Sequence, residues 1–361
     1  ILDYFCDYFV RCTVLDDDGN AQAFCYQVGD GASHSSWVAA EDETINRPAY
    51  FADASNPATD QVSEAAAALA IHYMNFGDKN YLDYAKKLFA LAKNNKKEAK
   101  STDGGGFYSS SSWSDDYCLA AAWLYKATGD STYKTEYDAY KSTVDVGAWP
   151  GWDQVGPYAI AYGSNDVSKL ESNFSATKGQ TSTISNGYSW LCKWGSARYN
   201  CNMQMEGLVI DNHNGKNQYT DWATGQMKFL LGNSKDKRCY VVGYNENSSK
   251  YPHHRSSSGY GAFPDSGYQH TIQAHVLLGA LVGGIEDASG TYHDSSADYY
   301  CNEVAIDYNA AFTGAAAALY LANKETDGID SDLLTAEELE EAGVSNTYSA
   351  PSEDTSSPKK V

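Results

Sequence analysis

Residues 291–312 read TYHDSSADYYCNEVAIDYNAAF, the most distinctive pattern in the chain. Polar and aromatic residues recur in it at fixed spacings, at Tyr292, Asp294, Tyr299, Glu303, Ala305 and Asn309. Glu303 stands directly before an apolar run, residues 304–323, whose period predicts a helix. Taken alone, a glutamate at the N-terminus of a helix is explained by the helix macrodipole, which favours a negative charge there.

A second pattern lies upstream, where residues 240–244 read YVVGY and residues 252–255 read PHHR. The imidazole of His253 and the guanidinium of Arg255 suit the recognition of hydroxyl groups without supplying a nucleophile. His254 points elsewhere in an extended conformation. Taken alone, a His-His-Arg run is a metal or loop feature as often as a sugar site.

Two further blocks contain aromatic residues. Residues 27–31 read QVGDG and are followed by His34, Trp37 and Arg47-Pro48. Trp190 and Trp194 precede the stretch GSARY at residues 195–199. Each tryptophan is either a stacking platform for a sugar ring or an ordinary part of the core.

In their order along the chain, the four blocks resemble glycoside hydrolase family 9, whose members cleave β-1,4-glucans such as cellulose by inversion. One departure is Asn245, where a glycine is usual. The resemblance implies an all-α fold, an (α/α)6 barrel with its cleft at the loop end of the helices. It implies a catalytic domain at residues 1–324, whereas the acidic, Ser/Thr/Pro-bearing residues 325–361 are expected to be a tail or linker.

Helical periodicity with alanine-rich faces agrees with an all-α fold. The strongest segments are residues 62–76, 81–93, 117–128, 194–210, 220–231, 270–283 and 304–323, and weaker ones lie near 1–12, 131–143 and 153–163. Gly129 can end one helix, and Asp130 or Ser131 can cap the next. Long polar or glycine-rich loops are expected at residues 25–60, 101–114, 145–152, 177–190 and 244–268.

The resemblance also implies roles for single residues. Glu303 takes the position of the proton donor, and Asp294 that of a residue that orients its neighbours or the substrate. The residues that the resemblance places against the sugar are His253, Arg255, Tyr308, His34, Trp37, Trp194, Trp113 and Phe107. Asp307 is expected to be structural.

No cofactor is expected to be required, but the resemblance implies a structural Ca²⁺ site beside the cleft. Its candidate ligands are Ser111, Ser112, Asp115, Asp116 and Asp153, whose hard oxygen atoms suit this ion. The alternative is that Asp115 and Asp116 cap the helix that follows them.

Inversion requires a general acid and a carboxylate base on opposite faces of the sugar, roughly 6.5–9.5 Å apart. Family members carry the base in an Asp-Ala-Gly-Asp motif, which does not occur in these 361 residues. We expect a missing N-terminal segment to carry the base and to complete the barrel, and we expect these residues alone to be inactive. The alternative is a non-catalytic β-glucan-binding or structural glycoprotein on the same fold.

Composition limits the partners. A formal net charge of -21 disfavours nucleic acid and anionic membrane surfaces, which bind clustered Lys and Arg. Aromatic residues make up 13% of the chain, which suits either a sugar-stacking groove or a tyrosine-rich helical core. The eight cysteines form no Cys-x-x-Cys pair, and their even number permits disulfides. Sequons at Asn173 and Asn247 favour a secreted glycoprotein.

Overall fold

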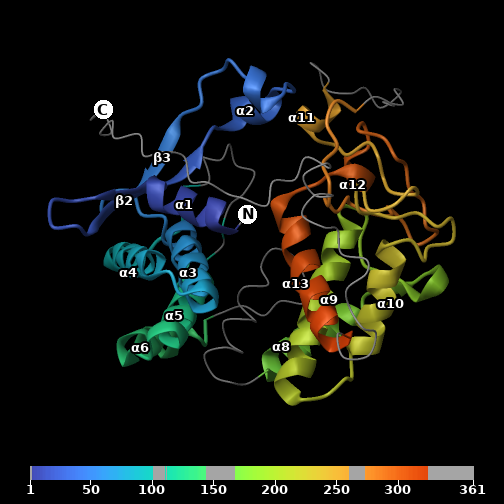
Figure 1. Ribbon diagram of the computed structural model, residues 1–361. Coiled ribbons are helices and arrows are strands. Elements are labelled where there is room, and N and C mark those ends of the chain that lie inside the picture. Colours follow the sequence, from blue (N-terminus) through green and yellow to red (C-terminus); the bar gives the residue numbers. More distant parts are fainter. Residues whose placement is uncertain (1, 101–109, 111, 144–166, 260–272, 324–361) are drawn as a thin grey trace.

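A computed structural model describes residues 2–100, 110, 112–143, 167–259 and 273–323 (Figure 1). Helices dominate this part of the chain, which confirms the all-α prediction. The first half contains α1 (Leu2–Cys12), α2 (Gly31–Ser35), α3 (Thr59–Phe76), α4 (Lys79–Asn94), α5 (Ser114–Thr128) and α6 (Ser131–Tyr140). The second half contains α8 (Ser168–Lys178), α9 (Ser196–Asn214), α10 (Thr220–Leu230), α11 (Arg255–Ser258), α12 (Tyr299–Asn302) and α13 (Ile306–Asn323).

Short turns with matched caps join the helices into hairpins. Gly77 ends α3 in the left-handed conformation, with φ +80°, and the side chain of Asp78 accepts from the Asn80 N–H to cap α4. Gly129 and Asp130 do the same between α5 and α6, as the sequence predicts. Only glycine adopts this backbone conformation without strain, so these two turns fix where each hairpin reverses.

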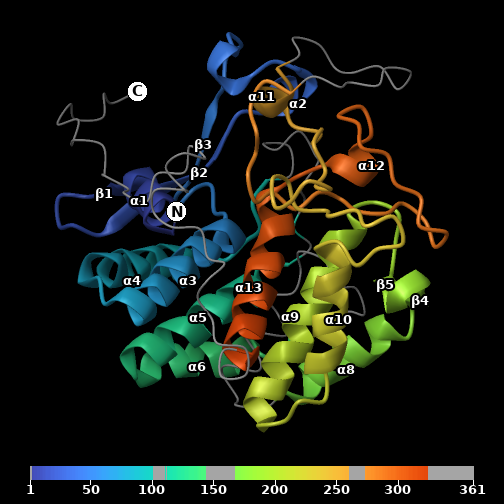
Figure 2. The same cartoon turned by 45° about the vertical axis from the view of Figure 1, so that its right-hand side comes forward.

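Small side chains let the helices approach one another closely. Ala65, Ala66 and Ala67 of α3 are buried, as are the alanines of the facing helix α5, Ala120, Ala121 and Ala122. In the second half, α9 packs against α8, α10 and α13. Figures 1 and 2 show α9, α10 and α13 side by side, with the loops that carry α11 and α12 at one end of them.

Two sequence-based predictions of secondary structure are wrong. Residues 273–283, the described part of the helix predicted at 270–283, are not helical. Leu281 instead forms a β-bridge with Val241, and Val242 donates to the Ala280 carbonyl. The loop predicted at residues 25–60 contains part of an antiparallel sheet of β1 (Thr13–Leu15), β2 (Ala21–Val28) and β3 (Ala49–Ala52).

The extended segment is buried, and glycine is needed where it meets α12. Ala280, Leu281 and Val282 belong to the core formed with α9, α10 and α13. A Cβ atom on Gly283 would collide with the Tyr300 carbonyl oxygen and crowd Cys301. A helix here would bury these residues against different neighbours, so the tertiary contact overrides the local period.

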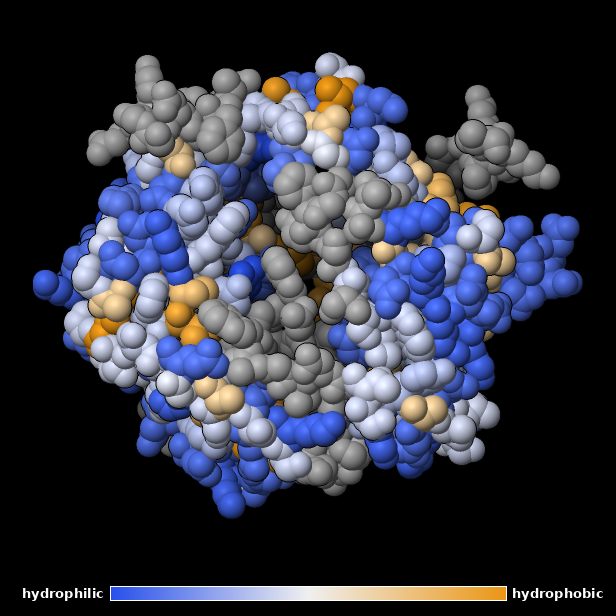
Figure 3. Space-filling view, turned by 180° about the vertical axis from the view of Figure 1, so that it is seen from behind, coloured by the Kyte–Doolittle hydropathy of each residue, from blue (hydrophilic) through white to orange (hydrophobic). Residues whose placement is uncertain are grey.

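The face opposite to that of Figure 1 is largely hydrophilic, with a hollow near its centre in which apolar residues are visible (Figure 3). Among the described helices, none has both the length and the apolar character needed to cross a bilayer. All eight cysteines are free thiols in this structure.

We predict that Gly283→Ala lowers the free energy of unfolding by about 1–3 kcal/mol, because overpacking forces the backbone of Tyr300 and Cys301 to move. Gly225→Ala, in the middle of α10, is the matched control. A Cβ there meets no atom within 4 Å, so it should raise stability by about 0.5–1 kcal/mol. Chemical denaturation of both variants measures the difference, and equal midpoints would contradict the packing described for Gly283.

Candidate active site

The carboxyl group of Glu303 is held by two donors. Glu303 directly follows α12, and its Oε2 atom accepts a hydrogen bond of 2.5 Å from Trp194 Nε1 and one of 2.9 Å from Tyr308 Oη. Both bonds end on the same oxygen. In the described part of the chain no hydrogen bond to Oε1 is seen, so this atom is the one available to a bound molecule.

Tyr308 is fixed as a hydrogen-bond donor. It is 1% exposed, and burial, then the neighbouring Glu303, raises the pKa of its hydroxyl far above the usual value. The Arg198 guanidinium lies over its ring, 4.8 Å from the centroid, and forms an ion pair of 2.9 Å with Asp307. A Cβ on Gly195, where φ is +67°, would lie 2.7 Å from Tyr308 Oη, so glycine is required there.

His253 lies beside Glu303 on a neighbouring segment. The two residues form an isolated parallel β-bridge, and His253 N–H donates to the Asn302 carbonyl at 2.7 Å. Its Nδ1 is 2.6 Å from the Ser296 carbonyl oxygen, so Nδ1 carries a proton. Burial lowers the pKa of His253. In the neutral tautomer that results, Nε2 is an acceptor suited to a hydroxyl group.

Trp37 packs against His253, with ring centroids 4.7 Å apart. The ring centroid of Tyr299 lies 5.9 Å from that of the same imidazole and 5.1 Å from that of Trp194. Trp194 is 47% exposed. The structure therefore brings Trp37, His253, Tyr299, Trp194 and Glu303 into one continuous cluster, although they come from four separate parts of the sequence.

Arg255 uses its guanidinium within the protein. Nη1 donates to the Ser33 carbonyl at 2.9 Å and Nη2 to the His34 carbonyl at 2.8 Å, and Glu43 completes an ion pair at 3.7 Å. These contacts join α11 to α2, which lie together in Figures 1 and 2. Arg255 thus positions the loop of His34, whose side chain is exposed, rather than presenting all its donors to a ligand.

Asp294 also makes contacts within the protein. Its carboxylate accepts from the backbone N–H groups of Lys250 and Tyr251 at 3.0–3.1 Å and pairs with Arg238 at 3.3 Å. It therefore ties the loop before α12 to the segment that leads to His253. This arrangement is that of an orienting residue.

Of the remaining predicted residues, those that the structure describes lie in or near α5. Trp113 precedes α5 and packs edge-on against Tyr117 and Tyr140, at the hydrophobic core that includes buried residues of α3, α4 and α5. Asp115 and Asp116 lie in the first turn of α5, and Trp113, the residue at the N-cap, makes no side-chain capping bond. The predicted residues Phe107, Ser111 and Asp153 lie outside the described residues.

Sequence reasoning missed several residues on which this site depends. Asn302 is fully buried and donates to the His293 and Ser295 carbonyls, which closes the loop before Glu303. In the sequence, only its position next to Glu303 could have indicated that Asn302 supports the site. Gly195 and Arg198 belong to the stretch GSARY, but their contacts with Tyr308 span more than a hundred residues and could not be read from that stretch alone.

Comparison with known proteins identifies the family of this chain. A sequence model of glycosyl hydrolase family 9 matches residues 1–316. The chain belongs to glycoside hydrolase family 9. Endoglucanase A of Bacillus pumilus is 34% identical over 348 residues, covering 85% of this chain and 50% of the relative. Endoglucanase B of Cellulomonas fimi is 34% identical over 352 residues, covering 88% of this chain and 33% of the relative. The chain thus spans half or less of the length of these two relatives.

Solved structures of family 9 members have the same fold. The catalytic domain of Clostridium thermocellum CelT is 42% identical, with a TM-score of 0.76 over 89% of this chain and 72% of that one. The cellulase Cel9M of C. cellulolyticum, in complex with cellobiose, is 34% identical, with a TM-score of 0.77 over 89% and 77%. The predicted (α/α)6 barrel architecture is confirmed by these neighbours.

The lowered pKa of His253 predicts a pH effect on stability. Because burial lowers this pKa in the folded state, the unfolded chain binds more protons below about pH 6.5, and stability falls as the pH drops through that window. His253→Asn keeps an amide donor for the Ser296 carbonyl and does not titrate, so it should lose less stability between pH 7.5 and 5.5. The exposed His213→Asn serves as the control, and unfolding midpoints that fall equally in all three proteins would refute the assignment.

Proposed function

We propose that this chain belongs to an endo-β-1,4-glucanase that hydrolyses cellulose or related β-glucans with inversion, with Glu303 as the general acid. The observation that carries the proposal is the pair of hydrogen bonds from Trp194 and Tyr308 to one oxygen of Glu303. A carboxyl group fixed in this way has one defined oxygen to offer to the leaving group. The family supports the reaction, since its endoglucanases act on β-glucans.

The two donors decide where the transferable proton sits. Trp194 Nε1–H can only donate, and the Tyr308 hydroxyl stays protonated because its pKa is raised. With both directed at Oε2, the proton of the neutral acid belongs on Oε1. Oε1 is then the atom that protonates the glycosidic oxygen as the bond breaks.

The surroundings suit a neutral polysaccharide. The exposed Trp194 offers an apolar face for a sugar ring, and Nε2 of His253 can accept from a hydroxyl group. The charge of -21 disfavours anionic ligands, whereas an uncharged glucan is unaffected. Relatives crystallised with cellobiose and with cellotriose support this class of ligand.

We further propose that the catalytic base is an aspartate outside these 361 residues, because the motif that carries it in the family does not occur in them. Asp294 is engaged with Arg238, Lys250 and Tyr251 and is poorly placed to activate water. A secreted protein is also proposed. Of its two sequons, Asn247 is exposed, whereas Asn173 in α8 is 3% exposed and unsuited to carry a glycan.

We predict that Glu303→Gln, in a protein extended upstream to include the base, lowers turnover by about 10²- to 10⁴-fold, because the amide keeps the shape but cannot give up a proton. Binding of cello-oligosaccharides should change little. Glu171→Gln in α8 is the control for the same chemical change at a distant carboxyl group. The rate of hydrolysis of soluble β-glucan is measured for the extended parent and both variants. Loss of binding without loss of turnover would refute the role of Glu303.

The 361-residue chain is assayed beside the extended protein and is expected to show no hydrolysis. Comparable activity would place a base within these residues. If the extended protein binds cello-oligosaccharides but is inactive with Glu303 intact, the chain is a binding protein.

A structural Ca²⁺ ion is proposed for the start of α5. Ser112, Asp115 and Asp116 offer only oxygen atoms, Asp116 is buried, and the carboxyl group of Glu64 of α3 lies near those of Asp115 and Asp116. When bound, the ion would link α3 to α5 and the loop before it.

Excess chelator should therefore lower the melting temperature, since an ion bound only by the folded state stabilises it by mass action. Asp116→Asn should melt at the lower temperature with or without chelator. An unchanged melting temperature in both experiments would contradict the proposed Ca²⁺ ion.

A further inference from the structure

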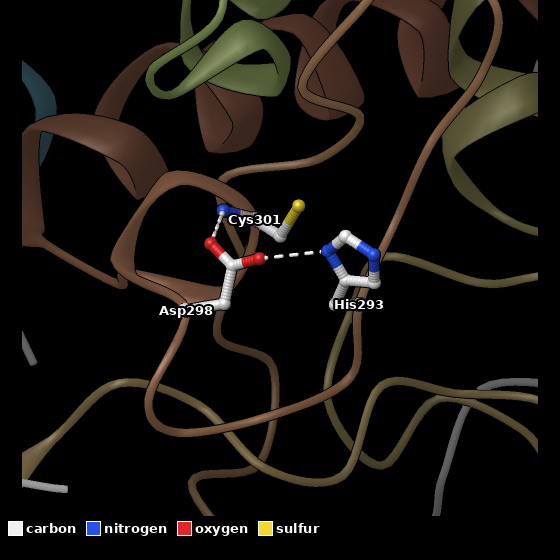
Figure 4. A group of neighbouring side chains, drawn as sticks. All are labelled: His293, Asp298 and Cys301. Atoms are coloured by element: carbon white, nitrogen blue, oxygen red, sulfur yellow. Dashed lines mark hydrogen bonds and ion pairs between the residues drawn. The ribbon is translucent and has the colours of Figure 1, made fainter. Parts of the chain in front are cut away.

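Three side chains with different ligand atoms meet on the loop that leads to Glu303. They are His293, Asp298 and Cys301, whose ligand atoms all lie within 4.8 Å of one another. His293 Nδ1 is 3.0 Å from Asp298 Oδ2. Figure 4 shows the imidazole and the carboxylate facing each other, with the sulfur atom of Cys301 beside them.

This set of donors matches one class of ion. Imidazole nitrogen, carboxylate oxygen and thiolate sulfur together suit Zn²⁺, whereas Ca²⁺ and Mg²⁺ prefer oxygen alone. Zinc bonds of about 2.0–2.3 Å in a tetrahedron place neighbouring ligand atoms about 3.3–3.8 Å apart. The separations here, from 3.0 Å to at most 4.8 Å, reach that geometry with small side-chain rotations.

The surroundings hold these ligands in place. Asp298 Oδ1 caps α12 by accepting from the N–H groups of Tyr300 and Cys301 at 3.0 and 3.1 Å, which leaves Oδ2 directed at His293. Asn302, which is fully buried, donates to the carbonyl of His293 and so fixes that residue's backbone. Contacts of this kind orient metal ligands and raise affinity.

The burial of the three residues indicates how an ion would enter. Cys301 is fully buried and the side chain of Asp298 is 18% exposed, whereas that of His293 is 58% exposed. The site is therefore closed on the protein side and open on the His293 side. Water from that side can supply the fourth ligand.

We propose that His293, Asp298 and Cys301 bind one Zn²⁺ ion, with water as the fourth ligand. The ion is separate from the hydrolytic chemistry, and its role is to stabilise the loop before Glu303, because only Asn302 separates Cys301 from Glu303. The proposal does not depend on the activity of the chain, and its test needs no substrate.

The test is to titrate the metal-free, reduced chain with Zn²⁺ alone, against a chromophoric chelator. One ion per chain should bind, and His293→Ala and Asp298→Asn should each weaken its binding at least about tenfold. Asp298→Asn keeps a residue that caps helices well, and His293 is exposed, so both variants should fold. His213→Ala, an exposed histidine in α9, is the matched control and should bind as the parent does.

Co²⁺ in place of Zn²⁺ reports the sulfur ligand. The parent chain and Cys192→Ser should show thiolate-to-cobalt charge transfer, and Cys301→Ser should not. Failure of the parent to retain zinc in the titration would overturn the proposal. Equal zinc affinity in the parent, His293→Ala and Asp298→Asn would overturn it as well, because the ion would then lie elsewhere.

Discussion

The site depends on the two hydrogen bonds that converge on Oε2 of Glu303. Trp194 and Tyr308 stand at the beginnings of α9 and α13, so these bonds require the two helices to pack together at that end. Close approach is possible because residue 195 has no side chain to obstruct the Tyr308 hydroxyl. The geometry of one carboxyl group thus rests on the packing of a helix pair, which is far more rigid than a loop.

The loops around this helix pair are fixed by polar groups that bond to other parts of the protein. Arg255 holds the α2 segment through two carbonyl groups, Asp294 holds residues 250 and 251, and Asn302 closes the turn before Glu303. Each of these side chains satisfies backbone groups that irregular structure would otherwise leave without partners. Residues that look like ligand contacts in a motif can therefore serve as its internal supports.

How much the sequence predicts depends on the range of the interaction. The α3/α4 and α5/α6 hairpins were predictable because periodicity, Gly129 and Asp130 act within a few residues. Glu303, His253 and Trp37 could be selected from the sequence because they belong to motifs with fixed spacing. Periodicity alone would not have indicated that they lie together. The helix predicted at 270–283 failed because its apolar residues pair with residues 240–242, about forty positions away. Neither that pairing nor the contact of Gly283 with Tyr300 leaves a local pattern.

The one buried arginine described beside Tyr308 has its charge compensated within the protein. Arg198 is close enough to place its guanidinium over the Tyr308 ring, yet it is paired with Asp307 at 2.9 Å and is only 6% exposed. A buried arginine without this partner would leave an uncompensated charge in the interior, which is costly. Asp307, in the first turn of α13, therefore has a role in charge compensation as well as in the helix. Because its carboxylate compensates the charge of Arg198, Tyr308 remains a neutral hydrogen-bond donor to Glu303.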